Sequence, residues 1–249
     1  MRVYNVNFIV FAVLCIKTCS TTNMALPDYI TACSRSDPHI DECMVDHANK
    51  ALPFVLKGDA KFNLPNLLPL KVPQININSK DSLSMQFTDC ELHGLESSVV
   101  TGMHVDFKEQ KTTLEVDIAH LNVLANYNIS GRILILPVVG QGPANITIAG
   151  GKYKYEFTFD LMRRKSGKQH VKFTWTNLEY TAKRIYLKLD NLFNGDRMLG
   201  DNMNRFLDEN WKDVTDELYP SLKEAVGAIV TSIARGLFSK IPFDDLFLP

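Results

Sequence analysis

The residues best suited to chemistry lie near the start of the chain, where two histidines stand among acidic side chains and a cysteine. His47 follows Cys43 by four residues, which would place both on one face of a helix. Histidine, thiolate and carboxylate groups are the usual ligands of zinc, so this segment could be a metal site. A disulfide at Cys43 would remove one ligand, and solvated charges on a helix are the simpler interpretation, so we expect no metal. The other candidate ligands are His39, Asp41, Glu42 and Asp46.

Three cysteines lie beyond residue 20. Cys33 and Cys43 are close in sequence and flank a turn-forming Ser-Asp-Pro stretch, so we predict a disulfide between them. Closing a loop of this size stabilises a fold by roughly 2–3 kcal/mol on chain-entropy grounds. Cys90 would keep a free thiol, and a buried, small apolar side chain is a better interpretation of it than a reactive group.

The motifs of the common catalytic machineries are not found in the sequence. It has no Gly-x-Ser-x-Gly elbow, no His-Glu-x-x-His motif and no phosphate-binding loop. Gly140 and Gly142 begin a dinucleotide-like pattern, but the third glycine is missing and Pro143 would break the helix that must follow. We therefore predict a protein that is not an enzyme and uses no cofactor, with an unrecognised hydrolase as the weakest alternative.

A basic cluster lies at a predicted hairpin, where Ser166-Gly167 indicates the turn. A solvated turn is the simpler interpretation, and docking to an anionic membrane or to a receptor is the alternative. The formal net charge of the whole chain is -1, so we expect no nucleic acid partner. The cluster consists of Arg163, Arg164, Lys165 and Lys168.

The first residues have the order of a secretory signal peptide. Arg2 supplies a positive start, the run FIVFAVLCI is apolar but too short to span a bilayer, and Thr18 and Ser20 suit the cleavage positions. We predict that residues 1–20 are a signal peptide and that residues 21–249 form a single secreted domain. A buried N-terminal strand is the alternative.

Two sequons for N-glycosylation lie in the body of the chain, Asn128-Ile-Ser130 and Asn145-Ile-Thr147. In a secreted protein a sequon that is used lies on the surface. Chance matches to this short motif are common, so the use of Asn128 and of Asn145 stays open.

The elements that would position these groups change in period along the chain. A helix is expected from Pro38 to about Leu52, because apolar residues recur there at spacings of three and four, with Pro53 in or at the end of the pattern and Gly58 as a stop. From about residue 61 to residue 192 the period is two, which predicts long antiparallel strands.

Five segments of this region alternate clearly. A further segment from Ile133 to Val139 is apolar on both faces and is expected to be a strand covered on both sides, or one that faces a cavity. The alternating segments are Val99 to Phe107, Leu114 to Ile118, Tyr153 to Leu161, Val171 to Trp175 and Ile185 to Leu189.

The end of the chain returns to the helical period, with one apolar stripe held for about eight turns. Asp201 or Asn202 is the expected N-cap, and Pro220 should kink the helix without dividing it, because the stripe keeps its phase. Such a helix needs a matching apolar trough. A sheet curled around the helix would supply one, and ordinary core packing without a cavity is the alternative. The stripe consists of Met203, Leu207, Trp211, Val214, Leu218, Leu222, Val226, Ile229 and Ile233.

Several strings of residues resemble the takeout and juvenile-hormone-binding protein family of insects. The most specific run from Asn191 to Asn204, from Phe206 to Trp211 and from Phe238 to Phe243. The resemblance covers nearly the whole chain after the signal segment. The weaker matches are Cys33 and Cys43 ahead of Lys50-Ala-Leu-Pro53, Gly94-Leu95, Tyr127-Asn-Ile-Ser-Gly131 and Leu136-Pro-Val.

The resemblance implies an α+β tubular lipid-binding fold, in which a long C-terminal amphipathic helix is wrapped by a strongly curved antiparallel sheet around an apolar tunnel. It implies a carrier without catalysis, secreted into haemolymph or sensory lymph, whose partner is a hydrophobic small molecule such as a terpenoid, a fatty-acyl compound or a juvenile hormone. Cys90 has no partner for the second disulfide of the hormone carriers, so the takeout branch is favoured. We expect a monomer, and a signalling or membrane-docking protein acting through the basic hairpin is the alternative.

The residues expected to line the tunnel come from the strands and the long helix. Tyrosines among them would supply polar contacts to the ligand. The set consists of Tyr127, Ile133, Ile135, Tyr153, Tyr155, Phe157, Met203, Phe206, Trp211, Ile229 and Ile233.

Overall fold

A computed structural model describes residues 26–79 and 83–249. The predicted signal peptide lies outside these residues. The strands are β1 (Cys33–Ser34), β2 (Leu70–Ser79), β3 (Leu83–His93), β4 (Ser98–Asp106), β5 (Lys111–Ile133), β6 (Leu136–Arg163), β7 (Gln169–Thr181), β8 (Arg184–Leu189) and β9 (Phe247–Leu248). The α-helices are α1 (Ile40–Lys57), α2 (Arg197–Glu209), α3 (Trp211–Phe238) and α4 (Phe243–Leu246), and short 3-10 helices span Ala60–Phe62, Leu95–Ser97 and Phe193–Gly195.

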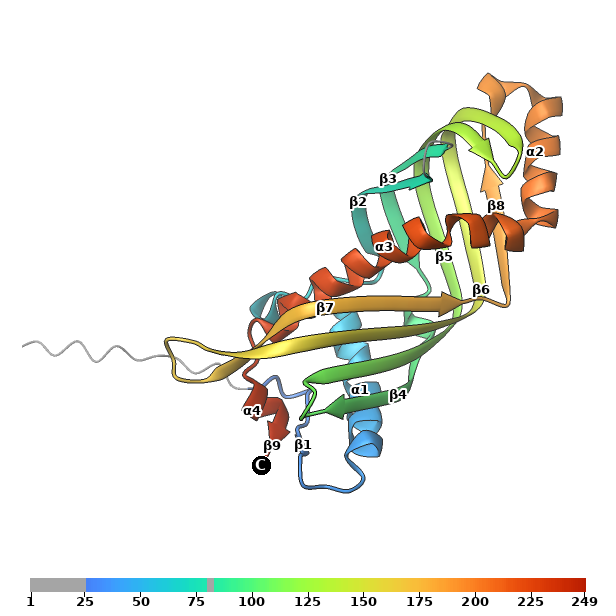
Figure 1. The fold of residues 1–249 in the computed structure, drawn as a ribbon. Coiled ribbons are helices and arrows are strands. Elements are labelled where there is room, and N and C mark those ends of the chain that lie inside the picture. Colours follow the sequence, from blue (N-terminus) through green and yellow to red (C-terminus); the bar gives the residue numbers. More distant parts are fainter. Residues whose placement is uncertain (1–25, 80–82) are drawn as a thin grey trace, which may run out of the picture.

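The long strands β5 and β6 form the spine of a seven-stranded antiparallel sheet (Figure 1). At one end, residues 122–131 of β5 pair with β3, β3 pairs with β2, and residues 144–149 of β6 pair with β8. At the other end, residues 111–118 of β5 pair with β4, and residues 152–163 of β6 pair with β7. The sheet curves around α3 but is not closed, and this α+β architecture confirms the predicted fold class.

The two ends of the sheet differ in the side chains that they bury. The end with β2, β3 and β8, covered by α2, is called here the aliphatic half, because its core holds mostly Leu, Ile, Val and Met. The end with β4 and β7, covered by α1 and α4, is called the aromatic half. Its buried core includes Tyr155, Phe157, Phe159, Phe173, Phe243 and Phe247.

The inward-facing positions of β5 change from even to odd numbers between the two halves. Thr112 and Ile118 are buried in the aromatic half, whereas Tyr127 and Ile129 are buried in the aliphatic half. Gly150, on the paired part of β6, has a φ of 62°, a left-handed conformation that glycine adopts without a steric penalty. The alternation therefore loses its phase at the junction, while both halves keep their apolar faces toward α3.

The C-terminal apolar stripe forms two helices, which corrects the prediction of one. The break lies at Asn210, whose backbone leaves helical geometry and whose side-chain Nδ2 donates to Phe206 O at 2.8 Å. An asparagine side chain competes in this way with the backbone for a carbonyl, which favours a helix end. Figure 1 shows α2 turning away steeply from α3. The N-cap is Asp196, whose carboxylate accepts from Leu199 N, and not Asp201 or Asn202.

Pro220 lies within α3, which continues through it without a break. A proline removes the backbone donor that would bond to the carbonyl of Asp216, four residues earlier. Both residues are exposed, so water can bond to this carbonyl. The predicted helix therefore survives its proline and is divided at an asparagine instead.

The apolar run from Ile133 to Val139 is not one strand, and the prediction was wrong. β5 ends at Ile133, and Leu134 and Ile135 form the hairpin turn before β6. Leu134 has a φ of 53°, and its N–H donates to Glu217 Oε2 at 2.7 Å. Ile135 is 85% exposed, so it cannot line an interior surface.

Candidate functional site

The candidate site lies between α3 and the inner face of the sheet, because α3 spans both halves (Figure 1). Its first turns bury Val214 and Leu218 in the aliphatic core. Its last turns pack Ala234 and Phe238 against the aromatic core. Ile229 and Ile233 face a third cluster, formed beside α1 by Leu56, Leu67 and Leu70.

The middle of α3 is packed less completely than its start. Four apolar side chains there contact the cores and yet stay only partly buried: Leu222, Val226, Ile229 and Val230. Val214 and Leu218, on the same helix, are buried. These four side chains therefore keep some apolar surface that protein atoms do not cover.

Three tyrosines gather beside this part of α3. The rings of Tyr153 on β6 and Tyr180 on β7 stack at 6.3 Å, and the rings of Tyr180 and Tyr219 on α3 lie 5.0 Å apart. The hydroxyl of Tyr180 is buried and has no hydrogen-bond partner among the described residues. Burial raises the pKa of Tyr153 to about 12, and burial, with help from Tyr219, also raises the pKa of Tyr180. A buried polar group without a partner costs about 1–3 kcal/mol, which favours a bound molecule that would pair with it.

Three tyrosines were predicted to contact a ligand, and of these Tyr127 and Tyr155 already have partners in the protein. Tyr127 donates to Asp190 O at 2.7 Å, and burial raises its pKa to about 12. Tyr155 shares a hydrogen bond of 2.8 Å with the buried hydroxyl of Thr231 on α3. Their hydroxyls are therefore occupied by contacts that hold the fold.

The predicted lining residues are distributed over several clusters. Tyr127, Ile133, Met203 and Phe206 belong to the aliphatic core or pack against it. Tyr153, Tyr155 and Phe157 belong to the aromatic core or pack against it, and Ile229 and Ile233 pack beside α1. Trp211 lies at the α2–α3 junction, where the guanidinium of Arg184 is 5.4 Å from its ring, and its place in the lining stays a prediction.

Sequence reasoning missed Tyr180 and Tyr219. A bulge in β7, where Thr158 pairs with Trp175 but Phe159 pairs with Phe173, reverses the alternation of the strand. Trp175 therefore points outward and is 49% exposed, and Tyr180 points inward. Tyr219 lies beside the predicted stripe, next to Pro220, and only the placement of β7 against α3 could have indicated its role.

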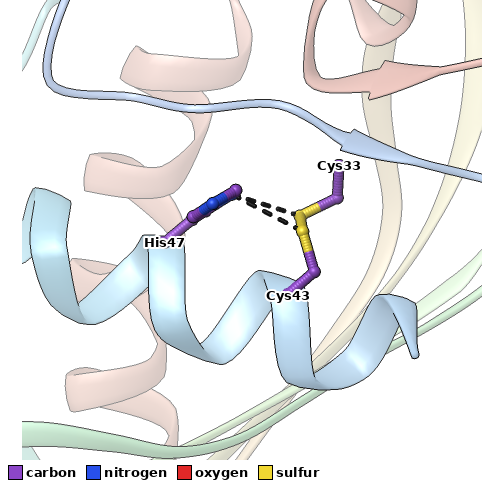
Figure 2. Close-up of side chains that lie close together, drawn as sticks. All are labelled: Cys33, Cys43 and His47. Atoms are coloured by element: carbon purple, nitrogen blue, oxygen red, sulfur yellow. Dashed lines mark hydrogen bonds between the residues drawn. A yellow bond between two sulfur atoms is a disulfide. The ribbon is translucent and has the colours of Figure 1, made fainter. Parts of the chain in front are cut away.

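The two cysteines of the candidate metal site form a disulfide with each other. Cys33 and Cys43 are bonded, as predicted, and His47 Nδ1 lies 3.4 and 3.5 Å from their sulfurs (Figure 2). Sulfurs that are bonded to each other cannot act as thiolate ligands. The acidic side chains of α1 have protein partners as well, because His104 bonds to Asp41 at 2.8 Å, His39 lies 3.3 Å from Glu42 and Lys50 lies 2.6 Å from Asp46. Cys90 has a free thiol that is 1% exposed, and burial raises its pKa.

Two grooves of the described residues lie on the outside of the molecule, and neither runs beneath α3. One is acidic and lies between α1, β4 and β5. The other is lined mainly by amide side chains on the outer face of the aliphatic half. The predicted tunnel therefore stays a prediction. Within the described ranges, no helix is long and apolar enough to cross a membrane.

Comparison with known proteins agrees with this architecture. Residues 9–248 match the family described as haemolymph juvenile hormone binding protein. The circadian clock-controlled protein daywake of Drosophila yakuba is 27% identical over 217 residues, covering 83% of this chain and 84% of that protein. The putative beta-carotene-binding protein of Schistocerca gregaria is 19% identical over 198 residues, covering 79% of both. Takeout 1 of Epiphyas postvittana is similar with a TM-score of 0.79 and 24% identity, covering 88% of this chain and 100% of that chain.

The long helix held by a curved, open antiparallel sheet is thus the fold of Takeout 1. The chain belongs to the haemolymph juvenile hormone binding protein family.

Proposed function

We propose that this protein is a secreted, non-enzymatic carrier that holds a hydrophobic small molecule between α3 and the inner face of the sheet. The observation that carries the proposal is the apolar surface on the middle of α3, which is only partly buried although the first turns of the same helix are buried. Membership of a family described by a bound hormone supports it, as does the similarity to a putative beta-carotene-binding protein.

The expected ligand has a long apolar body and at least one oxygen that can accept a hydrogen bond. The apolar body fits the surface offered by Leu222, Val226 and Val230, and the oxygen would accept a hydrogen bond from Tyr180. Terpenoids, fatty-acyl compounds and esters like juvenile hormone share these features. Burying apolar surface supplies the affinity, and the tyrosine supplies orientation.

The direct test is to ask what the protein carries and where. We expect native mass spectrometry of the purified chain to show a bound apolar molecule, and a fluorescent fatty acid to bind after that molecule has been extracted. Val226→Trp should fill the space beside α3 and abolish binding of the probe. Ala228→Trp places the same ring on the exposed side of α3 and should leave binding unchanged. Both variants should keep their melting temperatures, and equal binding by both would refute this position of the ligand.

A second candidate function is membrane docking through the basic hairpin. The β6–β7 hairpin extends beyond the body of the molecule (Figure 1). The side chains of Arg163, Arg164 and Lys165 at its tip are exposed. Lys168 is not available, because its Nζ binds the carboxylate of Asp245 at 2.8 Å. Three neighbouring cations favour an anionic lipid surface by about 1 kcal/mol each.

Co-sedimentation with phosphatidylserine vesicles separates the two functions. Neutralising Arg163, Arg164 and Lys165 should abolish sedimentation and leave binding of the fatty-acid probe intact. The matched control neutralises three exposed lysines elsewhere, Lys57, Lys61 and Lys212. Equal losses in both variants would show a general charge effect and exclude the hairpin as a docking site.

A further inference from the structure

The outer face of the aliphatic half carries a row of amide side chains. Gln86 on β3 is the direct cross-strand neighbour of Asn128 on β5, and Asn128 is the neighbour of Gln141 on β6. All three are exposed, whereas Phe87 and Tyr127 beside them point into the core. Neighbouring strands lie about 4.8 Å apart, so the row repeats at intervals close to the width of a sugar ring.

This row lies in a groove with a volume of about 450 Å³. No charged side chain lines it. Asn191 Nδ2 donates to Gln141 O at 2.8 Å and fixes one wall, and Gln86 Nε2 donates to Asn76 Oδ1 at 3.3 Å. The side-chain amides of Asn128 and Gln141 make no hydrogen bond within the described part of the chain. The lining residues are Gln86, Thr88, Asn126, Tyr127, Asn128, Gln141, Gly142 and Asn191.

The chemistry of the groove fits a neutral saccharide. Each amide offers two donors and one acceptor without charge, which suits hydroxyl and acetamido groups. An apolar ligand would leave these amides without partners, and a charged ligand would find no counter-charge. The groove thus differs in kind from the apolar surface beneath α3.

The position of Asn128 indicates where the saccharide comes from. The groove has no exposed aromatic ring on which a free sugar could stack, since the ring of Tyr127 is buried. Hydrogen bonds alone, each worth about 1 kcal/mol net, bind a free sugar weakly. Asn128 both lines the groove and begins the sequon Asn128-Ile-Ser130. A glycan attached there would be present at a millimolar effective concentration.

We propose that Asn128 is glycosylated and that the first two sugars of its glycan lie in the amide groove. The amides of Gln86, Asn126 and Gln141 hold these sugars against the sheet, so the glycan core covers the outer face of the aliphatic half. The inference rests on the proposed secretion, because N-glycosylation takes place in the secretory pathway.

The second sequon provides a matched control within the same chain. Asn145 is also exposed on the outer face, but it does not line the groove. Its Oδ1 accepts from Asn122 Nδ2 at 2.7 Å, and Thr147 Oγ1 accepts from the same amide at 2.9 Å. A glycan on Asn145 would therefore extend into solvent.

The test compares how fast an endoglycosidase cuts the two glycans. The full chain is secreted from a eukaryotic host treated with a mannosidase inhibitor, so that all glycans are of the high-mannose type. The enzyme cuts between the first two N-acetylglucosamines, and mass spectrometry of peptides reports each site. We expect release from Asn128 to be about tenfold slower than release from Asn145 in the native protein, and equal after denaturation.

Variants assign this protection to the groove. Gln86→Ala combined with Gln141→Ala should remove the difference, and Asn145→Gln should leave Asn128 protected. The proposal is wrong if Asn128 is unoccupied while Asn145 is occupied, if native release rates are equal, or if protection survives the loss of both glutamines. Two empty sequons in a protein retained in the cell would refute secretion together with this proposal.

A last arm separates the attached glycan from a free one. The unglycosylated chain, made in bacteria, is titrated with N,N′-diacetylchitobiose and followed by NMR. We expect no saturation below about 10 mM, because hydrogen bonding alone is weak without the tether. Saturation at micromolar concentration would identify the groove as a site for an external saccharide and overturn the attached-glycan proposal.

Discussion

The aliphatic and aromatic halves bury apolar surface in different ways. Five of the most completely buried side chains belong to the aliphatic core or its edge: Cys90, Ile129, Ile133, Leu192 and Leu207. The aromatic core has no member of that set, and its buried residues are 3–9% exposed. Branched aliphatic chains interdigitate closely, whereas aromatic rings prefer offset or edge-to-face arrangements with their neighbours. The aliphatic half thus holds the most completely buried side chains, and we expect a ligand to bind beside the aromatic half, where the hydroxyl of Tyr180 lacks a partner among the described residues.

The largest expected effect comes from shortening one buried side chain in each half. Phe157 contacts the rings of Tyr155, Phe159, Phe173 and Phe238, so Phe157→Ala should lower the free energy of unfolding by about 3–5 kcal/mol. Ile129→Ala should cost about 2–5 kcal/mol. Urea denaturation measures both.

The two variants should then differ in their response to a bound fatty acid. The probe should restore part of the stability of Phe157→Ala, because the new space adjoins the proposed binding surface. It should not raise the stability of Ile129→Ala beyond the gain seen in the unmodified chain. A larger rescue of Ile129→Ala would place the ligand in the aliphatic half and reverse the comparison.

The disulfide is the next largest contribution, and it belongs to the aromatic half alone. It links β1 to α1, and β1 pairs in parallel with β9, so it ties both ends of the described chain to this half. Replacing Cys33 and Cys43 by serine should cost about 2–3 kcal/mol. Hydrogen exchange should speed up in β1, β9 and α1 and stay unchanged in β3. Uniform loss of protection would mean that the halves do not unfold separately.

The period of the apolar residues was enough to predict the type of most elements. Strands and helices follow the alternation of two and the spacing of three and four, and the Cys33–Cys43 disulfide is confirmed. The prediction of one continuous helix was wrong at Asn210, because a side-chain hydrogen bond can end a helix without interrupting the apolar spacing. The prediction of a strand through Ile135 was wrong for the converse reason, since an apolar residue in a turn cannot be told from a strand residue by its apolar character.

The candidate site was harder to predict than the fold. Tyr180 faces inward because a bulge in β7 shifts the alternation of inward-facing and outward-facing side chains by one residue. A similar shift occurs in the paired strands β5 and β6 near Gly150. Bulges and left-handed residues leave little trace in a pattern of hydrophobicity. The sequence could therefore suggest tyrosines as polar contacts to a ligand, but it could not show which hydroxyls are free. Tyr127 donates to Asp190 O, whereas the hydroxyl of Tyr180 lacks a partner among the described residues.

A smaller effect distinguishes these two tyrosines. Tyr127→Phe removes a buried hydrogen bond to Asp190 O, so it should lower the free energy of unfolding by about 1–2 kcal/mol and leave ligand affinity unchanged. Tyr180→Phe removes a hydroxyl without a partner, so it should not destabilise the empty protein but should weaken the binding of an oxygen-bearing ligand by about fivefold. Thermal unfolding and titration calorimetry measure the pair. The opposite assignment of effects would remove Tyr180 from the site.

The smallest expected effect is a dependence on pH that arises in the aromatic half. His170 on β7 is 6% exposed, and its Nδ1 has no partner among the described residues. Burial lowers the pKa of His170, and the positive charges of Arg164 and Lys168 lower it further. A hydrogen bond to the backbone of Phe238 and the negative charge of Asp245 act in the opposite direction. Folding therefore favours the neutral imidazole over the charged form.

Protons bind this histidine more readily in the unfolded chain, where its pKa is about 6.5. Its contribution to stability is thus complete above about pH 6.5 and declines as the pH falls through that value. His170→Gln should show a shallower loss of stability between about pH 7 and pH 5 in urea denaturation, whereas His120→Gln, at an exposed position, should follow the unmodified chain. Equal slopes for all three proteins would mean that acid sensitivity is not a property of the aromatic half. If only His170→Gln makes the loss of stability with falling pH shallower, then the acid sensitivity of the protein arises in the aromatic half.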